Sequence, residues 1–168
     1  MTADKTETAL PRRSARAARA SRAAAPPAAR PLPPSLAGDR SLPYPAISRE
    51  LAELRHEIPG VQGCVLGGVD GLLITHNLQN EVDPNDLAAL AATTFGLGRQ
   101  VGMRLGQGDF QQSTVRNQGG YLSVYAVSEQ ALLAVIGTDT VNVARLHLNA
   151  PGVAGRIAAL LTPVPTED

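Results

Sequence analysis

The sequence predicts an α+β domain with the element order α-β-β-α-β-β-β-α, in which a five-stranded antiparallel sheet carries helices on both faces. Three stretches have apolar residues at the three-to-four spacing of an amphipathic helix. Between them lie short apolar or alternating runs, which are typical of strands. Turn pairs such as Asp70-Gly71 and Gly119-Gly120 separate these runs. Because such short connections form hairpins rather than crossovers, the sheet is predicted to be antiparallel.

The first 44 of the 168 residues differ in composition from the rest. They carry eight Lys and Arg against three acidic side chains, together with many Ala and Pro. A segment this poor in large apolar residues does not bury enough surface to fold, so residues 1–44 are predicted to be a disordered Arg/Ala/Pro-rich tail. The tail is expected to be solvated, or to contact anionic surfaces weakly. The domain is predicted over residues 45–162, followed by a frayed end at 163–168.

The first ordered element is predicted to be a helix that begins near Ser48, a good N-cap residue, with Glu50 in its first turn. Pro59 ends this helix. Its apolar stripe consists of Ile47, Leu51, Leu54 and Ile58. A hairpin follows, with strands at 61–66 and from residue 72 onward, joined by the Asp70-Gly71 turn.

The second helix has the strongest start signal, with Asp83 as N-cap and Pro84 at the first helical position. Gly106 and Gly108 are predicted to end it. Its apolar residues at helical spacing are Leu87, Leu90, Ala91, Thr94, Leu97, Val101 and Leu105. Gly98 and Gly102 share a face, and each is costly inside a helix. A face of small side chains favours close approach, either to the sheet or to a second copy of this helix.

The remaining strands are predicted at 109–116, 121–127 and 131–136. The first of these is polar on both faces and lacks Pro, so it is predicted to be an edge strand. The third is apolar on both faces, which favours a central position. The last helix is predicted to start at Asp139 or Thr140. Pro151 either kinks this helix or begins a second short one.

The sequence contains no pattern that indicates catalysis, a cofactor or a metal site. It has no phosphate-binding loop, and the glycines of the second helix lack the spacing of a dinucleotide-binding turn. His56, His76 and His147 are scattered and are expected to be surface residues. Cys64, the only cysteine, is expected to be a small core residue. The chain is therefore predicted to be a binding module rather than an enzyme.

Its location is predicted to be cytoplasmic, with membrane contact only through partners. No apolar run approaches the ~18–20 residues that span a bilayer, and a single cysteine fits a reducing compartment. Because aromatic residues are few, no specific nucleic-acid partner is expected.

The element order and several local motifs together resemble the Roadblock/dynein light-chain family. The motifs are Ile58-Pro59-Gly60-Val61, Asp70-Gly71-Leu72, the alanine-rich helix 87–105 and Gly119-Gly120-Tyr121-Leu122. The similarity covers residues 47–162 and is to the bacterial, actinobacterial type related to MglB. Pro151-Gly152 and the basic tail depart from the family pattern. The resemblance implies a Roadblock/profilin-like sandwich.

The resemblance also implies a non-enzymatic homodimer that regulates or scaffolds a small Ras-like GTPase in bacterial signalling, with an associated sensor kinase as a further partner. Strand 109–116 would pair with its twin, and the long helices would lie together. Candidate dimer residues are Gly98, Gly102, Phe110, Gln112 and Thr114. Candidate partner residues are Leu97, Arg99, Val101 and Arg104. The alternative is a small-ligand sensor of profilin/PAS-like architecture, with polar candidates Gln62, Thr75 and His76.

Overall fold

The computed structural model of the chain describes residues 35–39 and 41–162. The predicted disorder of residues 1–34 and fraying of 163–168 lie outside these residues. The observed order is the predicted one, α-β-β-α-β-β-β-α. The elements are α1 (Tyr44–Glu57), β1 (Val61–Gly68), β2 (Leu73–Leu78), α2 (Pro84–Leu105), β3 (Gln112–Asn117), β4 (Gly120–Ala126), β5 (Ala131–Thr138) and α3 (Val143–Leu161).

The five strands form one antiparallel sheet in the order β2-β1-β5-β4-β3. The predicted central position of the 131–136 strand is confirmed, because β5 lies in the middle. The edge position predicted for the 109–116 strand is confirmed as well, because β3 has a neighbour on one side only among the described strands. The predicted turn at Asp70-Gly71 also forms. Gly71 has a φ of +86°, and the Asp70 carboxylate accepts a hydrogen bond from the Leu72 N–H at 3.0 Å.

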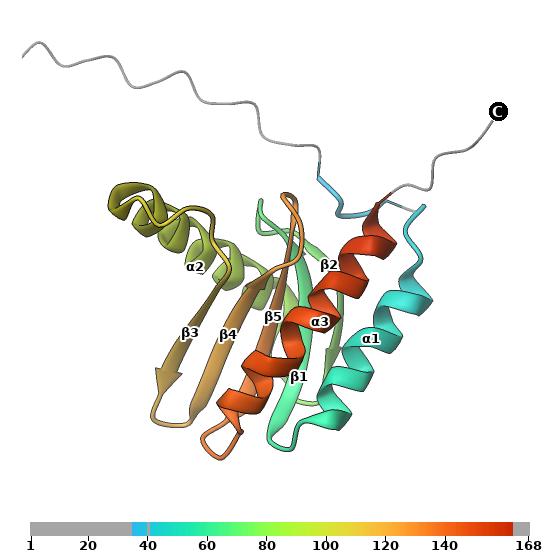
Figure 1. The fold of residues 1–168 in the computed structure, drawn as a ribbon. Coiled ribbons are helices and arrows are strands. Elements are labelled where there is room, and N and C mark those ends of the chain that lie inside the picture. Colours follow the sequence, from blue (N-terminus) through green and yellow to red (C-terminus); the bar gives the residue numbers. More distant parts are fainter. Residues whose placement is uncertain (1–34, 40, 163–168) are drawn as a thin grey trace, which may run out of the picture. The chain divides into compact units, whose positions relative to one another are not determined.

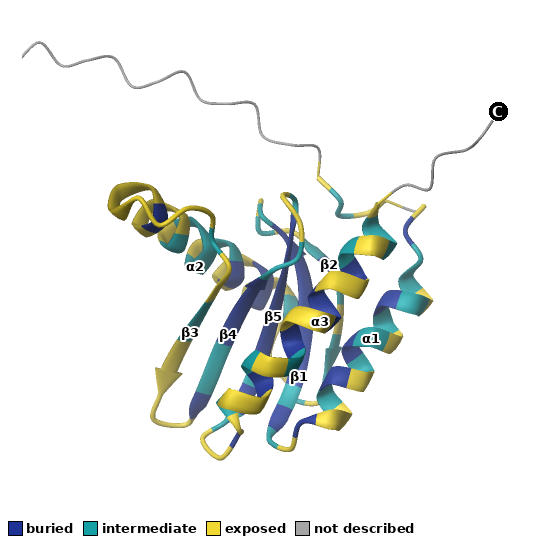
Figure 2. Ribbon diagram, in the orientation of Figure 1, coloured by how far each residue is buried: buried dark blue, intermediate teal, exposed yellow. Residues whose placement is uncertain are grey.

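Helices cover both faces of the sheet, as predicted (Figure 1). On one face, α1 and α3 pack over a core that includes Leu51, Leu133, Leu146 and Ile157, all fully buried. On the other face, α2 packs over a smaller core around Leu87 and Ala91. The α1 and α3 side chains that point at the sheet are buried, whereas β3 and the far end of α2 are largely exposed (Figure 2).

The packed structure begins before residue 45, the boundary expected from composition. Helix α1 starts at Tyr44, so Ser48 is not its N-cap and Glu50 is not in its first turn. Pro45 lies in the first turn instead, where its fixed φ suits a helix and its missing N–H removes no hydrogen bond. Leu42 is buried and Leu36 packs against the same core. These two leucines supply apolar surface that the average composition of the segment conceals.

Two other boundaries differ from the prediction, and one open alternative is decided. Strand β3 starts at Gln112 rather than Asp109, because the preceding residues turn toward α2. Helix α3 is capped by Asn142, whose side chain accepts a hydrogen bond from the Arg145 N–H, and not by Asp139 or Thr140. Helix α3 is also one helix, so a second helix beginning at Pro151 is excluded. Pro151 is exposed, which places its ring where it disturbs no core contact.

Candidate protein-binding surface

The long helix α2 begins as its sequence indicates. The Asp83 carboxylate accepts a hydrogen bond from the Asn85 N–H at 2.8 Å, and Pro84 follows it at the first helical position. At the other end Gly106 adopts the left-handed conformation, with φ +65°. Between these caps the helix runs for 22 residues. The α2 residues that pack in or against the small core lie between Leu87 and Phe95, so most of the second half of the helix extends beyond that core.

Helix α2 carries apolar side chains on two faces. The inward face contains Leu87, Ala88 and Ala91, which are buried against the sheet. An outward stripe of large apolar side chains also follows helical spacing, and its members are Leu90 (52% exposed), Leu97 (66%), Val101 (44%) and Leu105 (65%). The apolar pattern read from the sequence as one stripe is thus divided between core and surface. A row of exposed leucine and valine side chains this long is typical of a protein-binding surface.

Strand β3 lies next to this part of α2 and forms an open edge of the sheet. Its backbone pairs with β4 from Gln112 to Asn117, with no strand on its other side among the described residues. Its residues are polar apart from Val115, which is 41% exposed. An unpaired edge offers a row of backbone N–H and C=O groups to another chain.

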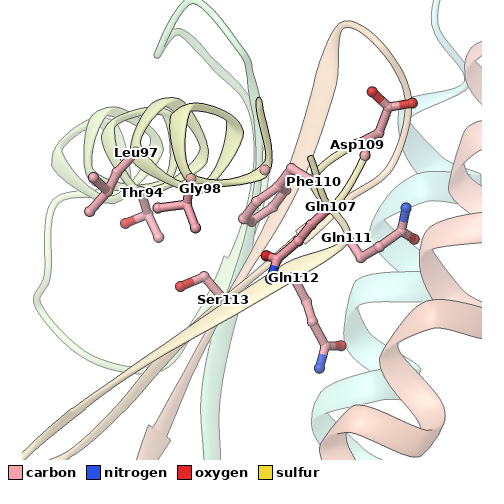
Figure 3. A pocket seen from close by; sticks show the side chains of 12 residues that line it. Thr94, Leu97, Gly98, Gln107, Asp109, Phe110, Gln111, Gln112 and Ser113 are labelled. Atoms are coloured by element: carbon pink, nitrogen blue, oxygen red, sulfur yellow. The ribbon is translucent and has the colours of Figure 1, made fainter. Parts of the chain in front are cut away.

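A groove of about 380 Å³ lies between α2 and the segment that leads into β3 (Figure 3). Asp109 is the only charged residue among those that line it. The others are Thr94, Leu97, Gly98, Val101, Gly102, Gln107, Gly108, Phe110, Gln111, Gln112 and Ser113. Its lining of apolar and neutral amide groups suits a protein surface better than a phosphate or metal ion, which need several charged or carboxylate groups.

An aromatic pair fixes one wall of the groove. The rings of Phe95 on α2 and Phe110 on the loop meet edge to face, with 5.3 Å between their centroids. Figure 3 shows Phe110 turned toward Gly98. A Cβ at Gly98 would collide with the Phe110 ring, and a Cβ at Gly102 would collide with the Gly108 carbonyl oxygen. The lack of a side chain at both positions is therefore explained within a single chain, because it allows the loop to pack against α2.

The structure brings six of the nine predicted interface residues together in this groove. They are Leu97, Gly98, Val101, Gly102, Phe110 and Gln112. Arg99 and Arg104 lie on exposed parts of α2 outside the groove, and the Arg99 guanidinium sits 5.6 Å from the centre of the Phe95 ring. Thr114 faces the other side of the sheet, where it contacts α3. Phe110 precedes the strand, so it does not continue one strand face with Gln112 and Thr114 as the alternation indicated.

The comparisons with known proteins agree with the fold. The family model of the Roadblock/LC7 domain matches residues 47–137, more than half of the chain. The chain belongs to the Roadblock/LC7 domain family. The match covers the structure from α1 through β5 and stops before α3.

Individual relatives extend this likeness. An uncharacterized protein of Methanocaldococcus jannaschii is 27% identical over 114 residues, which cover 68% of this chain and 98% of that protein. The structure of a Roadblock/LC7 domain from Streptomyces avermitilis matches with a TM-score of 0.63 and 25% identity, covering 67% of this chain and 95% of that one. The gliding protein MglB from Thermus thermophilus matches with a TM-score of 0.67 and 22% identity, covering 77% and 97% respectively.

The other candidate residues of this Roadblock/LC7 domain lie outside the groove. Within residues 35–39 and 41–162, no group of three or more His, Cys, Asp or Glu side chains is placed to hold a metal ion. Cys64 is buried, and this burial raises the pKa of its thiol to about 12, so it is a core residue and not a nucleophile. Gln62, Thr75 and His76 do not line the groove. No helix in the described part is long and apolar enough to cross a bilayer.

Two features were missed from the sequence. The Phe95–Phe110 pair joins residues on different elements, which only the path of the 106–111 loop brings together. His147, expected at the surface, is half-buried between α3 and the sheet and hydrogen-bonded there. His147 lies three residues before Ala150, a buried position, and so on the same face of α3. This spacing was the one signal in the sequence that His147 faces the core.

Proposed function

We propose that this Roadblock/LC7 domain is a non-enzymatic, dimeric binding module that regulates or scaffolds a small Ras-like GTPase in a bacterial signalling system. One observation carries the proposal: the outer stripe of α2 leaves Leu97, Val101 and Leu105 exposed beside the unpaired strand β3. A domain that gained nothing from this surface would be expected to place polar residues there.

Self-association through β3 would cover the apolar stripe of α2 and also pair the open edge of β3. Pairing of β3 with its twin would join two sheets into one and give the edge N–H and C=O groups partners. A two-fold axis at that strand would bring the two α2 helices together on the same face of the joined sheet. Burial of the apolar stripe would then supply the non-directional part of the binding energy. In this arrangement Gly98, Gly102, Phe110, Gln112 and Thr114 lie at or near the interface.

The GTPase would bind along α2 through Arg99 and Arg104, which lie outside the groove, and through the parts of Leu97 and Val101 at the border of the dimer interface that the second copy leaves exposed. The two arginines are exposed, and the described residues provide neither with a carboxylate partner. Exposed arginines are suited to the carboxylates and phosphates that surround a nucleotide-binding site. Regulation requires different affinities for the GTP-bound and GDP-bound states, because only differential binding shifts a switch. In the cell, this complex would be cytoplasmic, would include a sensor kinase, and would reach the membrane through its partners.

The test uses the full chain as bait in extract of the source organism, with a GTP analogue in one sample and GDP in the other. The proposal expects a small GTPase enriched in one nucleotide state. The double variant Arg99→Ala/Arg104→Ala should lose that enrichment, whereas Arg145→Ala, an exposed arginine on α3, should keep it. Absence of any small GTPase from both samples would overturn the GTPase proposal and leave the fold assignment untouched.

A further inference from the structure

Helix α2 has a second exposed flank, on the far side of the helix from the outer stripe. Ala92, Gly96, Arg99 and Met103 follow one another at intervals of three or four residues and therefore share this flank. The turn between β1 and β2 packs against its beginning, because a Cβ at Gly71 would lie 3.7 Å from the Ala92 Cβ. None of these residues lines the groove beside β3. A second copy that pairs through β3 and covers the outer stripe would thus leave this flank open.

Two large apolar side chains lie at the ends of the flank. Leu72, in the turn between β1 and β2, is 52% exposed, and Met103, near the end of α2, is 66% exposed. Neither belongs to the outer stripe. The residues between them include Ala92 and Gly96, whose small size keeps the surface of the helix low. Exposed apolar side chains on either side of a low surface suit a protein that lays a segment along the helix.

Gly96 has no explanation within the described part of the chain. A glycine in the interior of a helix is destabilising relative to alanine. The loop that carries Phe110 accounts for Gly98 and Gly102, whereas a Cβ at Gly96 would meet nothing within 4 Å. The missing side chain allows the backbone of another protein to approach the helix closely. Gly96 therefore lies where the main chain of a partner would cross the flank.

Arg99 gives this flank its charge. Its guanidinium lies 5.6 Å from the centre of the Phe95 ring, and this contact orients the side chain. Arg99 is exposed, and among the described residues no carboxylate forms a salt bridge with it. At the other end of the flank the Asp70 carboxylate accepts a hydrogen bond from the Leu72 N–H. The complementary partner is therefore a protein segment with a carboxylate opposite Arg99 and apolar side chains opposite Leu72 and Met103.

We propose that this flank is part of the docking surface for the small GTPase, which places a carboxylate on Arg99, its backbone over Gly96, and apolar side chains on Leu72 and Met103. The inference rests on the proposed function and extends the GTPase contact beyond the α2 residues named there. The second copy is not the occupant, because the stripe that it covers lies on the opposite side of the helix. Helix α2 thus has two interfaces, the outer stripe for the second copy and this flank for the GTPase.

The test compares two substitutions on the flank with the same substitutions on α3. Gly96→Gln blocks the close approach, and its control is Gly155→Gln, because a Cβ at either glycine meets nothing within 4 Å. Glutamine favours a helix over glycine, so misfolding does not account for lost binding. Met103→Glu places a charge on the flank, and its control is Leu148→Glu, since Leu148 is 81% exposed on α3.

Each full-length variant is titrated with the purified GTPase that the wild-type chain captures from extract, in the nucleotide state that binds more tightly. Gly96→Gln and Met103→Glu should each raise the dissociation constant roughly tenfold or more. Gly155→Gln and Leu148→Glu should leave it unchanged. Sedimentation of all four variants should show the self-association of the wild type.

An unchanged dissociation constant in both flank variants would overturn the inference and leave the proposed function standing. Weaker self-association of Gly96→Gln or Met103→Glu would also overturn it, because the second copy would then cover the flank. Failure of the wild-type chain to capture any small GTPase would overturn the proposed function, and the assignment of this flank with it.

Discussion

Helices α2 and α3 are the two long helices of the domain, and they use their apolar residues in opposite ways. In α3, Leu146, Val153 and Ile157 are buried against the sheet and α1, and Leu148 is the one large apolar side chain that is highly exposed. In α2, the buried residues are mostly small, and most of the large apolar residues face outward. The apolar residues of α3 therefore stabilise the monomer. Those of α2 are available to a second protein.

The largest expected effect contrasts two leucines of α3. Leu146→Ala should lower the free energy of unfolding by about 2–5 kcal/mol, because it leaves a cavity at a fully buried position. Leu148→Ala should change it by less than about 0.5 kcal/mol, since Leu148 is 81% exposed. Urea unfolding of both variants measures the difference. Similar losses for the two would mean that Leu148 is covered by another surface in solution.

The next effect contrasts α2 with α3 at exposed leucines. Leu97→Glu should weaken self-association by roughly tenfold or more, because a charge would be placed in the apolar stripe of the proposed interface. Leu148→Glu should leave self-association unchanged. Sedimentation at several concentrations measures both. Equal self-association by the two variants would remove the outer stripe of α2 from the dimer interface, and the contrast between the two helices would lose its functional meaning.

A smaller effect sharpens the description of α2 itself. Gly96→Ala should raise the free energy of unfolding by about 1 kcal/mol, because a Cβ there meets nothing within 4 Å and alanine favours the helix. Gly98→Ala should instead lower it by about 1 kcal/mol or more, because the new methyl would displace the Phe110 ring from Phe95. Thermal unfolding of the two variants gives the comparison. Stabilisation by both would show that the 106–111 loop does not pack on α2.

The smallest effect concerns the start of α2. The Asn85 backbone N–H, together with its side-chain amide, holds the pKa of the exposed Asp83 below the usual 3.8. The stabilisation that comes from this charge is therefore present above pH 3.8 and is lost as the pH falls through the lower value of the folded state. Asp83→Asn keeps a capping oxygen without the charge. The wild type should be slightly more stable than the variant near neutral pH and equal to it in strong acid, as measured by urea unfolding.

Much of the fold was accessible from local patterns. Asp83 and Pro84 mark the start of α2, Asp70-Gly71 marks the first hairpin, and the double-sided apolar pattern of residues 131–136 marks the central strand. These features depend on interactions between residues close in the chain, or on burial that affects both faces of a strand alike. Capping, turn conformation and strand alternation are properties of short segments.

The surface was less predictable, because it depends on contacts between distant segments. Helical spacing placed Leu87 and Leu97 in one apolar pattern, yet only the position of the sheet buries the first and exposes the second. Gly98 was predicted to contact either the sheet or a second helix, and the loop that carries Phe110 supplies a neighbour that neither expectation included. The role predicted for Arg99 likewise took no account of Phe95, although the Arg99 guanidinium lies over the Phe95 ring.

The sequence alone determined the element order, the helix and hairpin signals and the edge character of β3, since each follows from the local chemistry of a few neighbouring residues. Tertiary structure decided which apolar residues of α2 remain exposed, where the groove beside Phe110 lies, and that His147 joins Tyr125 to Thr114. The physical reason is that burial and hydrogen-bond partners depend on which surfaces meet in space, and residues 114, 125 and 147 meet only when the sheet and α3 have packed.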